Sequence, residues 1–398
     1  MNIIIQKFGG TSVATEESRK AVIGKIIAAK EKGLTPVVVV SAIGRKGSPY
    51  ATDTLLDFVT QTAGPLEDAA YDLLLSCGEI ISAVTMATLL TQNGFKAKAL
   101  TGGQAGIFTD DVHKNAELLT TEPQWILEYL EAGIIPVVAG FQGITKRGEI
   151  TTIGRGGSDT TAAILGVALK AQYIEIYTDV DGIMTADPRV CDRAKFISAI
   201  SYNEVFQMAD SGAKVIHPRA VEYARTANIP LVIKNTFSDE PGTFIVQQVK
   251  SQEKVGRPSI LTSVAHKTNR VQFTIQDEVL SEKELLREIA NENISIDLIN
   301  IFPHHKIFTV DGEDQKKLEA LLSKGQYPYT FIAGCAKVTA IGERMTGVPG
   351  VMARMIKALS KAQIEILQTA DSLTTIGCLI KEEKVAEAVT LLHEEFHL

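Results

Sequence analysis

The first 235 residues alternate short β-branched strand patterns with helical patterns, and this alternation constrains the fold more than any other feature. Strands are predicted over 2–8, 36–41, 95–100, 134–140, 172–179 and 229–235, and helices near 16–32, 53–62, 66–92, 115–132 and 158–170. The valine run at 37–40 suits a strand covered on both faces. The alternation therefore predicts an α/β fold, with a mostly parallel central sheet and helices on both faces.

The remaining third of the chain carries a weak internal repeat. Residues 237–260 mix charge, proline and glycine, and are predicted as a linker that follows a first domain of residues 1–236. Beyond the linker, 285–299 superimposes on 355–369, and 271–275 matches 337–341. The repeat predicts two copies of a small strand–helix–strand module, 261–335 and 336–398, with a chance likeness of two amphipathic segments as the alternative.

Charge and cysteine content exclude several classes of protein. The net charge of −7 disfavours nonspecific binding of nucleic acid. The four cysteines lie far apart without a CxxC spacing, which argues against a zinc site or a disulfide scaffold and suits a reducing compartment. We find no secretory signal pattern and no apolar run near the ~20 residues that cross a bilayer. The sequence thus predicts a cytoplasmic protein with no membrane or nucleic-acid partner.

The stretch KFGGTS at 7–12 directly follows the first predicted strand and precedes a helix. Its glycine turn and the free N–H groups of a helix start can cradle an anion. Lys7 would add a point charge where negative charge grows on a transferring phosphoryl group. The stretch matches neither GxxxxGK[ST] nor GxGxxG, so a purely structural turn between strand and helix is the alternative.

A second glycine-rich stretch, TIGRGGSDT at 152–160, carries its own cation. Arg155 offers a planar fork for a carboxylate or a phosphate, and Gly156 and Gly157 leave room for a ligand. Ser158 or Asp159 would also make an ordinary helix N-cap. A capped turn with an exposed arginine is therefore the alternative.

Three further stretches hold polar residues in suggestive places. YTDVDGIMTADPR (177–189) follows a strand at the carboxyl edge of the sheet, where ligands bind in open α/β sheets, and it lacks the final Glu of a calcium loop. Glu79 stands among apolar and small residues and needs a partner, either a substrate ammonium or a group within the protein. Lys214 precedes a helix predicted to begin near Pro218, with His217 as a helix-start residue.

Seven motifs, in the same order, resemble those of the aspartate kinases. They are KFGGTS (7–12), VVSA (39–42), CGE (77–79), GRGGSD (154–159), TDVDG (178–182), ADPR (186–189) and KVIHP (214–218). The resemblance covers essentially the whole chain, because that family ends in paired ACT modules. It implies an amino-acid-kinase αβα sandwich followed by two ferredoxin-like (βαββαβ) ACT domains. The implied reaction transfers the γ-phosphoryl group of MgATP to the β-carboxylate of L-aspartate and gives 4-phospho-L-aspartate.

The resemblance also implies roles for individual residues. The catalytic residues would be Lys7, Asp159 and Lys214. L-aspartate would contact Ser41, Thr52, Glu79, Arg155, Gly156, Gly157 and Ser158. ATP, which carries its own Mg²⁺, would contact Lys7, Gly9, Gly10, Thr11, Ser12, Thr178, Asp179, Met184, Asp187, Arg189 and Lys214, and no protein metal site is expected. Glu79 would meet the substrate ammonium and Arg155 a substrate carboxylate. Asp159 would orient the lysines, because a carboxylate nucleophile is already ionised near neutral pH and phosphoryl transfer needs positioning more than a base.

Paired ACT modules further imply a homodimer and feedback inhibition by lysine, meso-diaminopimelate or threonine. The first module lacks the Pro-Gly turn that the second keeps at 347–350, and in the family the strand before the first module, here 260–266, can belong to the second. A glutamate, N-acetylglutamate or carbamate kinase is one alternative, against which CGE, GRGGSD and the tandem modules argue. A non-catalytic amino-acid sensor is another, and it would have no use for Lys7, Asp159 and Lys214 together.

Overall fold

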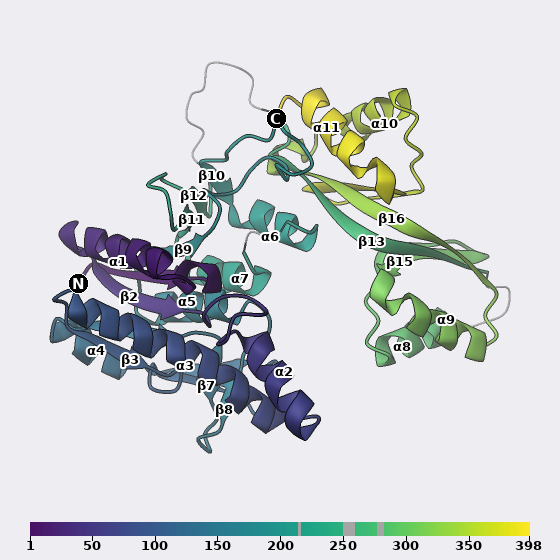
Figure 1. Cartoon of the computed structure of the whole chain (residues 1–398). Coiled ribbons are helices and arrows are strands. Elements are labelled where there is room, and N and C mark those ends of the chain that lie inside the picture. Colours follow the sequence, from purple (N-terminus) through teal and green to yellow (C-terminus); the bar gives the residue numbers. More distant parts are fainter. Residues whose placement is uncertain (214–215, 250–258, 277–281) are drawn as a thin grey trace. The chain divides into compact units, whose positions relative to one another are not determined.

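The computed structural model describes residues 1–213, 216–249, 259–276 and 282–398, which pack as two compact units (Figure 1). The first unit comprises Met1–Ile183, Phe196–Phe206 and Lys214–Ser251. The second comprises Met184–Lys195, Gln207–Ala213 and Gln252–Leu398. Two short segments that precede residue 214 in the sequence therefore pack within the second unit.

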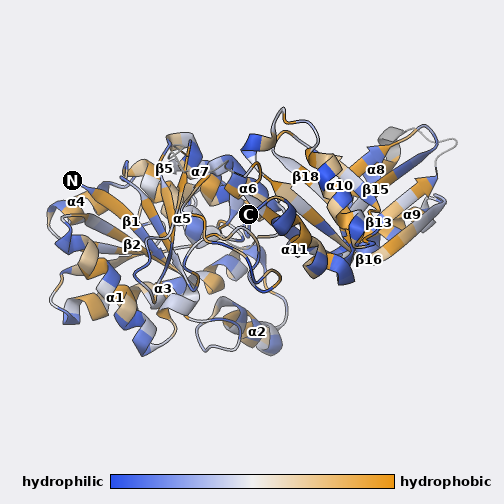
Figure 2. Ribbon diagram, turned by 90° about the horizontal axis from the view of Figure 1, so that it is seen from above, coloured by the Kyte–Doolittle hydropathy of each residue, from blue (hydrophilic) through white to orange (hydrophobic). Residues whose placement is uncertain are grey.

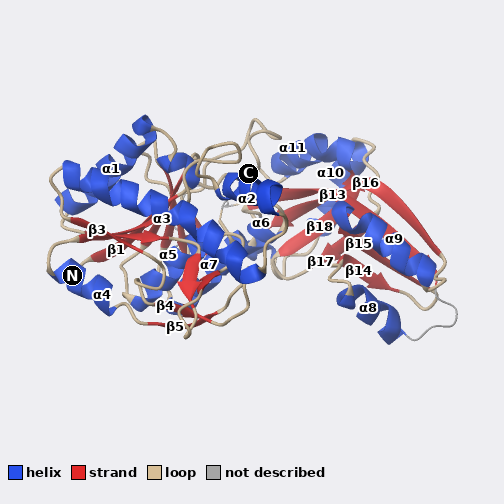
Figure 3. Cartoon of the chain, turned by 60° about the horizontal axis from the view of Figure 1, so that its bottom comes forward, coloured by secondary structure: helices blue, strands red, loops and turns tan. Residues whose placement is uncertain are grey.

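The first unit is built on an eight-stranded sheet in the order β10-β12-β11-β9-β1-β2-β6-β3. Figure 3 draws the strands in red, with β1 and β3 of this sheet labelled. The strands from β11 to β3 are mutually parallel, whereas β12 runs antiparallel to β11. The strands are β1 (Ile3–Phe8), β2 (Thr35–Val40), β3 (Ala97–Leu100), β6 (Ile135–Ala139), β9 (Ile174–Thr178), β10 (Ala199–Ser201), β11 (Leu231–Asn235) and β12 (Thr243–Val246). The prediction of an α/β fold with a mostly parallel sheet is confirmed.

Helices cover both faces of this sheet. Helices α1 (Glu16–Glu31), α3 (Asp68–Gln92), α4 (Gln124–Glu131) and α5 (Gly157–Ala168) contact its strands. This part of the chain also contains α2 (Thr52–Ala63), α6 (Tyr202–Asp210), α7 (Pro218–Ala227) and a 3₁₀ turn η1 (Gly10–Val13). Helices α1 and α3 share one core with alternate residues of β2, in which Ile26 and Met86 meet Val38 and Val40. Helix α5 packs on β1 and β9, where Gly166 lies against Ile174. Strand β1, between these layers, is mostly hydrophobic (Figure 2).

Helix α3 is long and apolar enough to cross a membrane by length and composition, with a mean hydropathy of 1.8 over 18 residues. The expectation that no apolar segment approaches the length of a membrane span is therefore wrong as regards length and composition. In the fold, half of this window is buried, and Leu75, Met86 and Leu90 lie in the protein interior. The apolar character of α3 is explained by its packing as a core helix of an α/β domain.

The predicted helix over 115–132 is wrong in its first half. Residues Leu118–Thr121 form β5, and α4 begins only after Pro123. Strand β5 belongs to a second sheet of order β5-β4-β7-β8, with β4 (Ile107–Thr109), β7 (Gln142–Ile144) and β8 (Ile150–Thr152). Pairing of β5 with β4 supplies backbone hydrogen bonds that outweigh the local helical pattern.

The second unit holds one six-stranded antiparallel sheet in the order β14-β15-β13-β16-β18-β17. Its strands are β13 (Ser263–Gln276), β14 (Asp297–Ile301), β15 (His305–Asp311), β16 (Tyr329–Ile341), β17 (Gln368–Asp371) and β18 (Thr375–Lys381). Its helices are α8 (Glu282–Asn291), α9 (Gln315–Lys324), α10 (Val351–Lys361) and α11 (Val385–Glu395), with 3₁₀ turns η2 (Gly312–Asp314), η3 (Glu343–Met345) and η4 (Glu382–Lys384).

Two βαββαβ modules share the long strands β13 and β16. In the first, the second half of β13 pairs with β15 and the first half of β16. In the second module, Ser263–Lys267 of β13 pairs with Lys337–Ile341 of β16. One strand of the second module therefore comes from a segment that precedes the first module in the sequence. The expected boundary at 335/336 thus falls inside β16, and β12 lies within the 237–260 segment expected as a linker. The boundaries between the predicted domains therefore stay a proposal. Each of the two modules contains one half of β13 and one half of β16.

Candidate active site

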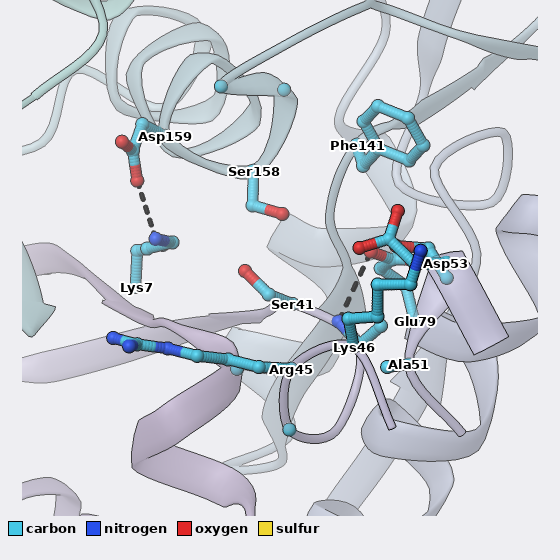
Figure 4. Close-up of a pocket in the computed structure, with 16 residues that line it drawn as sticks. Lys7, Ser41, Arg45, Lys46, Ala51, Asp53, Glu79, Phe141, Ser158 and Asp159 are labelled. Atoms are coloured by element: carbon cyan, nitrogen blue, oxygen red, sulfur yellow. Dashed lines mark hydrogen bonds and ion pairs between the residues drawn. The ribbon is translucent and has the colours of Figure 1, made fainter. Parts of the chain in front are cut away.

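A cavity of about 550 Å³ lies in the first unit, at the carboxyl ends of β1, β2 and β6 and beside the first turn of α5. Its lining residues come from KFGGTS, the loop after β2 and the start of α2, helix α3, the residues after β6 and the second glycine-rich stretch (Figure 4). They are Lys7, Gly10, Ser41, Ala42, Gly44, Arg45, Lys46, Ala51, Thr52, Asp53, Glu79, Phe141, Gly156, Gly157, Ser158 and Asp159. Motifs that lie far apart in the sequence therefore meet at one edge of the parallel sheet, as the strand pattern requires.

Lys7 and Asp159 form an ion pair at one side of this cavity (Figure 4). The Lys7 Nζ lies 2.6 Å from Asp159 Oδ1, and the two side chains are 12% and 15% exposed. Lys7 is the penultimate residue of the parallel strand β1, and Asp159 stands in the first turn of α5, where the helix dipole favours an anion. The carboxylate fixes the direction of the ammonium group and leaves both beside the open cavity.

Glu79 stands on α3 at the other side of the cavity, and its carboxyl is only half satisfied by the protein. Its Oε1 accepts a hydrogen bond of 3.1 Å from the Ala42 N–H, whereas Oε2 is buried without a hydrogen-bond partner in the described part of the chain. Burial raises the pKa of Glu79 to about 8, against hydrogen bonds from backbone N–H groups that lower it. A buried carboxyl with one open oxygen calls for a cationic or hydrogen-bond-donating ligand.

The loop from Ser41 to Ala51 closes over the 3₁₀ turn of KFGGTS. The Gly44 N–H donates to the Gly10 carbonyl at 3.0 Å, and a Cβ on Gly10 would stand 2.5 Å from the Gly44 oxygen. Gly10 is therefore required for this close approach of two backbones. Ser41, Thr52 and Gly10 all line the cavity, and the ligand contacts that the resemblance implies for them stay predictions.

The second glycine-rich stretch presents its glycines, but not its arginine, to the cavity. Gly156 has a φ of 71° and lies against His217, whose Cγ would be 2.3 Å from an added Cβ. Gly156, Gly157 and Ser158 line the cavity. Arg155 is exposed and lies outside the lining. Its predicted contact with a substrate carboxylate stays a prediction.

Asp72 anchors the strand that leads into this stretch. It is fully buried on α3 and accepts hydrogen bonds from the Thr152 N–H at 3.0 Å and the Thr152 hydroxyl at 2.6 Å. The Lys114 N–H and the His113 ring also contact its carboxylate. One helix thus carries both Glu79 and, two turns earlier, the residue that fixes β8. The sequence shows Asp72 only as a polar residue in a mostly apolar helical segment.

The remaining predicted nucleotide contacts lie outside the cavity lining. Ser12 is buried and hydrogen-bonds Thr236 at 2.7 Å, and Gly9 and Thr11 belong to the same turn. Thr178 and Asp179 stand at the end of β9. Met184, Asp187 and Arg189 pack with the second unit, where the Arg189 guanidinium donates to the Asp187 carboxylate at 2.7 and 3.0 Å. Lys214 lies outside the described residues.

Seven lining residues are not among the site residues predicted from the sequence: Ala42, Gly44, Arg45, Lys46, Ala51, Asp53 and Phe141. Phe141 has a φ of 70°, which is rare for an aromatic residue, and its N–H donates to Thr161. No local sequence signal marks this conformation. Arg45 and Lys46 stand in a stretch of Gly, Ser and Pro that is typical of a solvated loop.

Comparison with known proteins agrees with this arrangement. The amino acid kinase family model matches residues 2–235, and an ACT domain model matches residues 331–394. The chain is 45% identical to aspartokinase 1 of Bacillus subtilis, over 100% of both chains. The chain belongs to the aspartokinase family. The aspartokinase of Geobacillus stearothermophilus is 38% identical, over 100% of this chain and 98% of that protein.

Solved aspartokinase structures share the fold over the whole chain. Aspartokinase III of E. coli in complex with lysine and aspartate has a TM-score of 0.79 at 25% identity, with 100% of both chains covered. The same enzyme in complex with aspartate and ADP has a TM-score of 0.81 at 24% identity, again over 100% of both chains. The predicted fold, an amino-acid-kinase domain followed by ACT modules, is thereby confirmed for this chain.

Proposed function

We propose that the chain is an aspartate kinase, which transfers the γ-phosphoryl group of ATP to the β-carboxylate of L-aspartate. The products are ADP and 4-phospho-L-aspartate, the entry to lysine, threonine and methionine synthesis. Family membership at 45% identity over the full chain supports this activity. The observation that carries the proposal is the buried Glu79 carboxyl, whose open oxygen faces a cavity that also holds Lys7 and Asp159.

The acceptor side of the site is proposed around Glu79. Its open Oε2 would receive the ammonium group of aspartate, which replaces the missing hydrogen bond and stabilises the carboxylate form. Ser41, Thr52 and Ser158 offer hydroxyl groups, and Gly156 and Gly157 offer backbone at close approach. Arg155 would reach the substrate carboxylate from outside the lining, which needs a change in its side-chain rotamer. The β-carboxylate would then be directed toward Lys7.

The donor side is proposed around Lys7. Its ammonium group is held by Asp159 and would contact the transferring phosphoryl group, which spreads negative charge over its oxygens during the reaction. Gly10 exposes backbone to the phosphates, and Gly9, Thr11, Ser12, Thr178, Asp179, Met184, Asp187, Arg189 and Lys214 complete the proposed nucleotide contacts.

Mg²⁺ would enter with ATP. The lining carboxylates Asp53, Glu79 and Asp159 stand on different elements, and among the described residues no group of three His, Cys, Asp or Glu could hold an ion. The donor set therefore fits a nucleotide-borne ion and not a protein-held one. Bound Mg²⁺ would neutralise charge on the phosphate oxygens. Asp159 has no proton to accept from the ionised β-carboxylate, so its part is to orient Lys7.

The second unit is proposed to regulate this reaction. Its ACT modules would bind an amino-acid effector, with lysine, meso-diaminopimelate and threonine as the candidates, and would pair two chains as a homodimer. We also place the enzyme in the cytoplasm, where its substrates are made.

The test is the Lys7→Ala variant in an assay that traps the acyl phosphate with hydroxylamine. We expect hydroxamate formation to be lost while the far-UV circular dichroism and the unfolding midpoint stay close to those of the wild type. Lys7 contributes charge more than packing, so the fold should tolerate the change. Near-normal turnover in this variant would overturn the assignment of Lys7 and Asp159 to phosphoryl transfer.

A further inference from the structure

Arg45 stands in the wall of the active-site cavity on a loop whose backbone is fixed. The Ser48 N–H donates to the Arg45 carbonyl at 2.8 Å, and the Arg45 N–H donates to the Ser48 hydroxyl at 3.3 Å. One residue earlier, Gly44 is hydrogen-bonded to Gly10 in the 3₁₀ turn that follows β1. The base of the Arg45 side chain is therefore held against the same turn that carries the proposed phosphate cradle.

The cavity places three cations among its lining residues: Lys7, Arg45 and Lys46. In the view of Figure 4, Arg45 extends toward the side that holds Lys7 and Asp159. Lys46 instead forms an ion pair of 3.5 Å with Asp57 on α2. Within the described lining, Arg45 is the single guanidinium group. Lys7 is already matched by Asp159, so besides the Mg²⁺ that ATP carries, one partly neutralised ammonium group would face the charge of the transferring phosphoryl oxygens.

The Arg45 side chain is held by a partner that a phosphate can replace. Its Nη2 lies 3.0 Å from Asp179 Oδ2 at the end of β9, and the two side chains are 72% and 48% exposed. Ion pairs exposed to this extent contribute little to stability. A phosphate offers a planar guanidinium two parallel, charge-assisted hydrogen bonds, so the exchange of Asp179 for a polyphosphate is favourable.

We propose that Arg45 is a further catalytic residue, whose guanidinium group contacts the transferring phosphoryl group across from Lys7. This inference rests on the proposed kinase function. In the step, a β-carboxylate oxygen of aspartate forms a bond to the γ-phosphorus as the bond from that phosphorus to the β,γ-bridging oxygen breaks. The electron pair leaves with ADP, and no proton moves. Arg45 neutralises charge on the equatorial oxygens, and Asp179 holds it in place until the nucleotide binds.

The test compares Arg45→Ala, Arg45→Lys and Lys46→Ala in steady-state kinetics with ATP and aspartate varied separately. We expect Arg45→Ala to lower kcat about 100-fold, with the KM for aspartate within about threefold of the wild type. Arg45→Lys keeps the charge but loses the planar fork, so an intermediate loss of about tenfold is expected. Lys20→Ala is the matched control, because Lys20 is equally exposed at 72%, forms an ion pair of 2.7 Å with Glu16, and lies on α1 outside the cavity lining.

Chemical rescue separates a catalytic guanidinium from a structural one. Guanidinium chloride at low millimolar concentration is expected to restore activity to Arg45→Ala, and sodium chloride at equal ionic strength is not. A kcat within threefold of the wild type overturns the inference, as does a loss confined to the KM for aspartate. A loss without rescue, or an equal loss in Lys46→Ala, also overturns it. An inactive wild type would instead overturn the proposed kinase function.

Discussion

Glu79 is expected to release a proton when aspartate binds. Burial raises the pKa of Glu79 to about 8 in the free site, so the carboxyl carries a proton in roughly nine of ten molecules at pH 7. The ammonium group of aspartate needs the carboxylate form at the open Oε2. Binding at pH 7 should therefore release about 0.9 protons per site from Glu79.

The same equilibrium weakens binding at low pH. Ionising Glu79 at pH 7 costs about 1.4 kcal/mol, so the Kd for aspartate should be about tenfold higher at pH 7 than at its high-pH limit. Isothermal titration calorimetry in two buffers of different ionisation enthalpy measures both the protons released and the Kd. Glu79→Gln, which keeps the side-chain shape, should release no protons. Wild-type proton release near zero at pH 7, or a Kd that does not change between pH 6.5 and 8.5, would show that Glu79 does not ionise when aspartate binds.

Glu79 should make the folded protein less stable as pH rises, whereas most carboxylates in folded proteins make it more stable. The pKa of Glu79 is higher in the folded state, about 8, than its ordinary value of 4.5, so the folded state binds more protons between these values. The free energy of unfolding should therefore fall as pH rises through this window, by on the order of 5 kcal/mol from this group alone. Urea unfolding of ligand-free Glu79→Gln should lack this contribution.

Two further changes test the walls of the site. Asp72→Asn should lower the free energy of unfolding by about 1–3 kcal/mol and raise the KM for aspartate. The reason is that an amide cannot accept every hydrogen bond that now fixes Thr152 and its neighbours. An unchanged unfolding midpoint and an unchanged KM would contradict this role of Asp72. Gly10→Ala should destabilise by about 1–3 kcal/mol and impair turnover, because its Cβ meets the Gly44 oxygen at 2.5 Å. Gly24 is the control, because it is exposed on a helix and no atom lies near the new Cβ. Gly24→Ala should stabilise the fold by about 0.5–1 kcal/mol in thermal unfolding. Equal effects of the two glycine variants would count against a steric requirement at Gly10.

Most of the main sheet could be predicted from the sequence because most of its strands have a recognisable pattern in their own residues. The valines at 37–40 form β2, which is buried on both faces, and His217 begins α7 with Pro218 in its first turn, as expected. Pairings between distant segments have no such local signal. The shared strands β13 and β16 pair with each other although a long stretch of sequence separates them. The antiparallel β12 and the strand β5 pair with the strands just before them, β11 and β4, but their own residues fell in an expected linker and an expected helix over 115–132.

The site could be predicted where a residue conflicts with its local context. Glu79 stood out as a carboxylate among apolar residues, and the structure gives it a buried, half-satisfied carboxyl. Arg45 and Phe141 escaped notice because a cation in a glycine-rich loop and an aromatic after a strand are ordinary. Their importance lies in position, since only the fold brings Arg45 to the cavity and holds Phe141 at positive φ.

The most direct test of the account is the reaction of the wild-type chain itself. The chain is incubated with ATP, Mg²⁺ and one acceptor at a time, namely L-aspartate, L-glutamate, N-acetyl-L-glutamate or carbamate, and ADP and hydroxylamine-trapped acyl phosphate are measured together. With L-aspartate we expect ADP and aspartyl hydroxamate in equal amounts, and with the other three acceptors neither product above the background without acceptor. ADP release without hydroxamate, or faster turnover with another acceptor, would contradict the assignment.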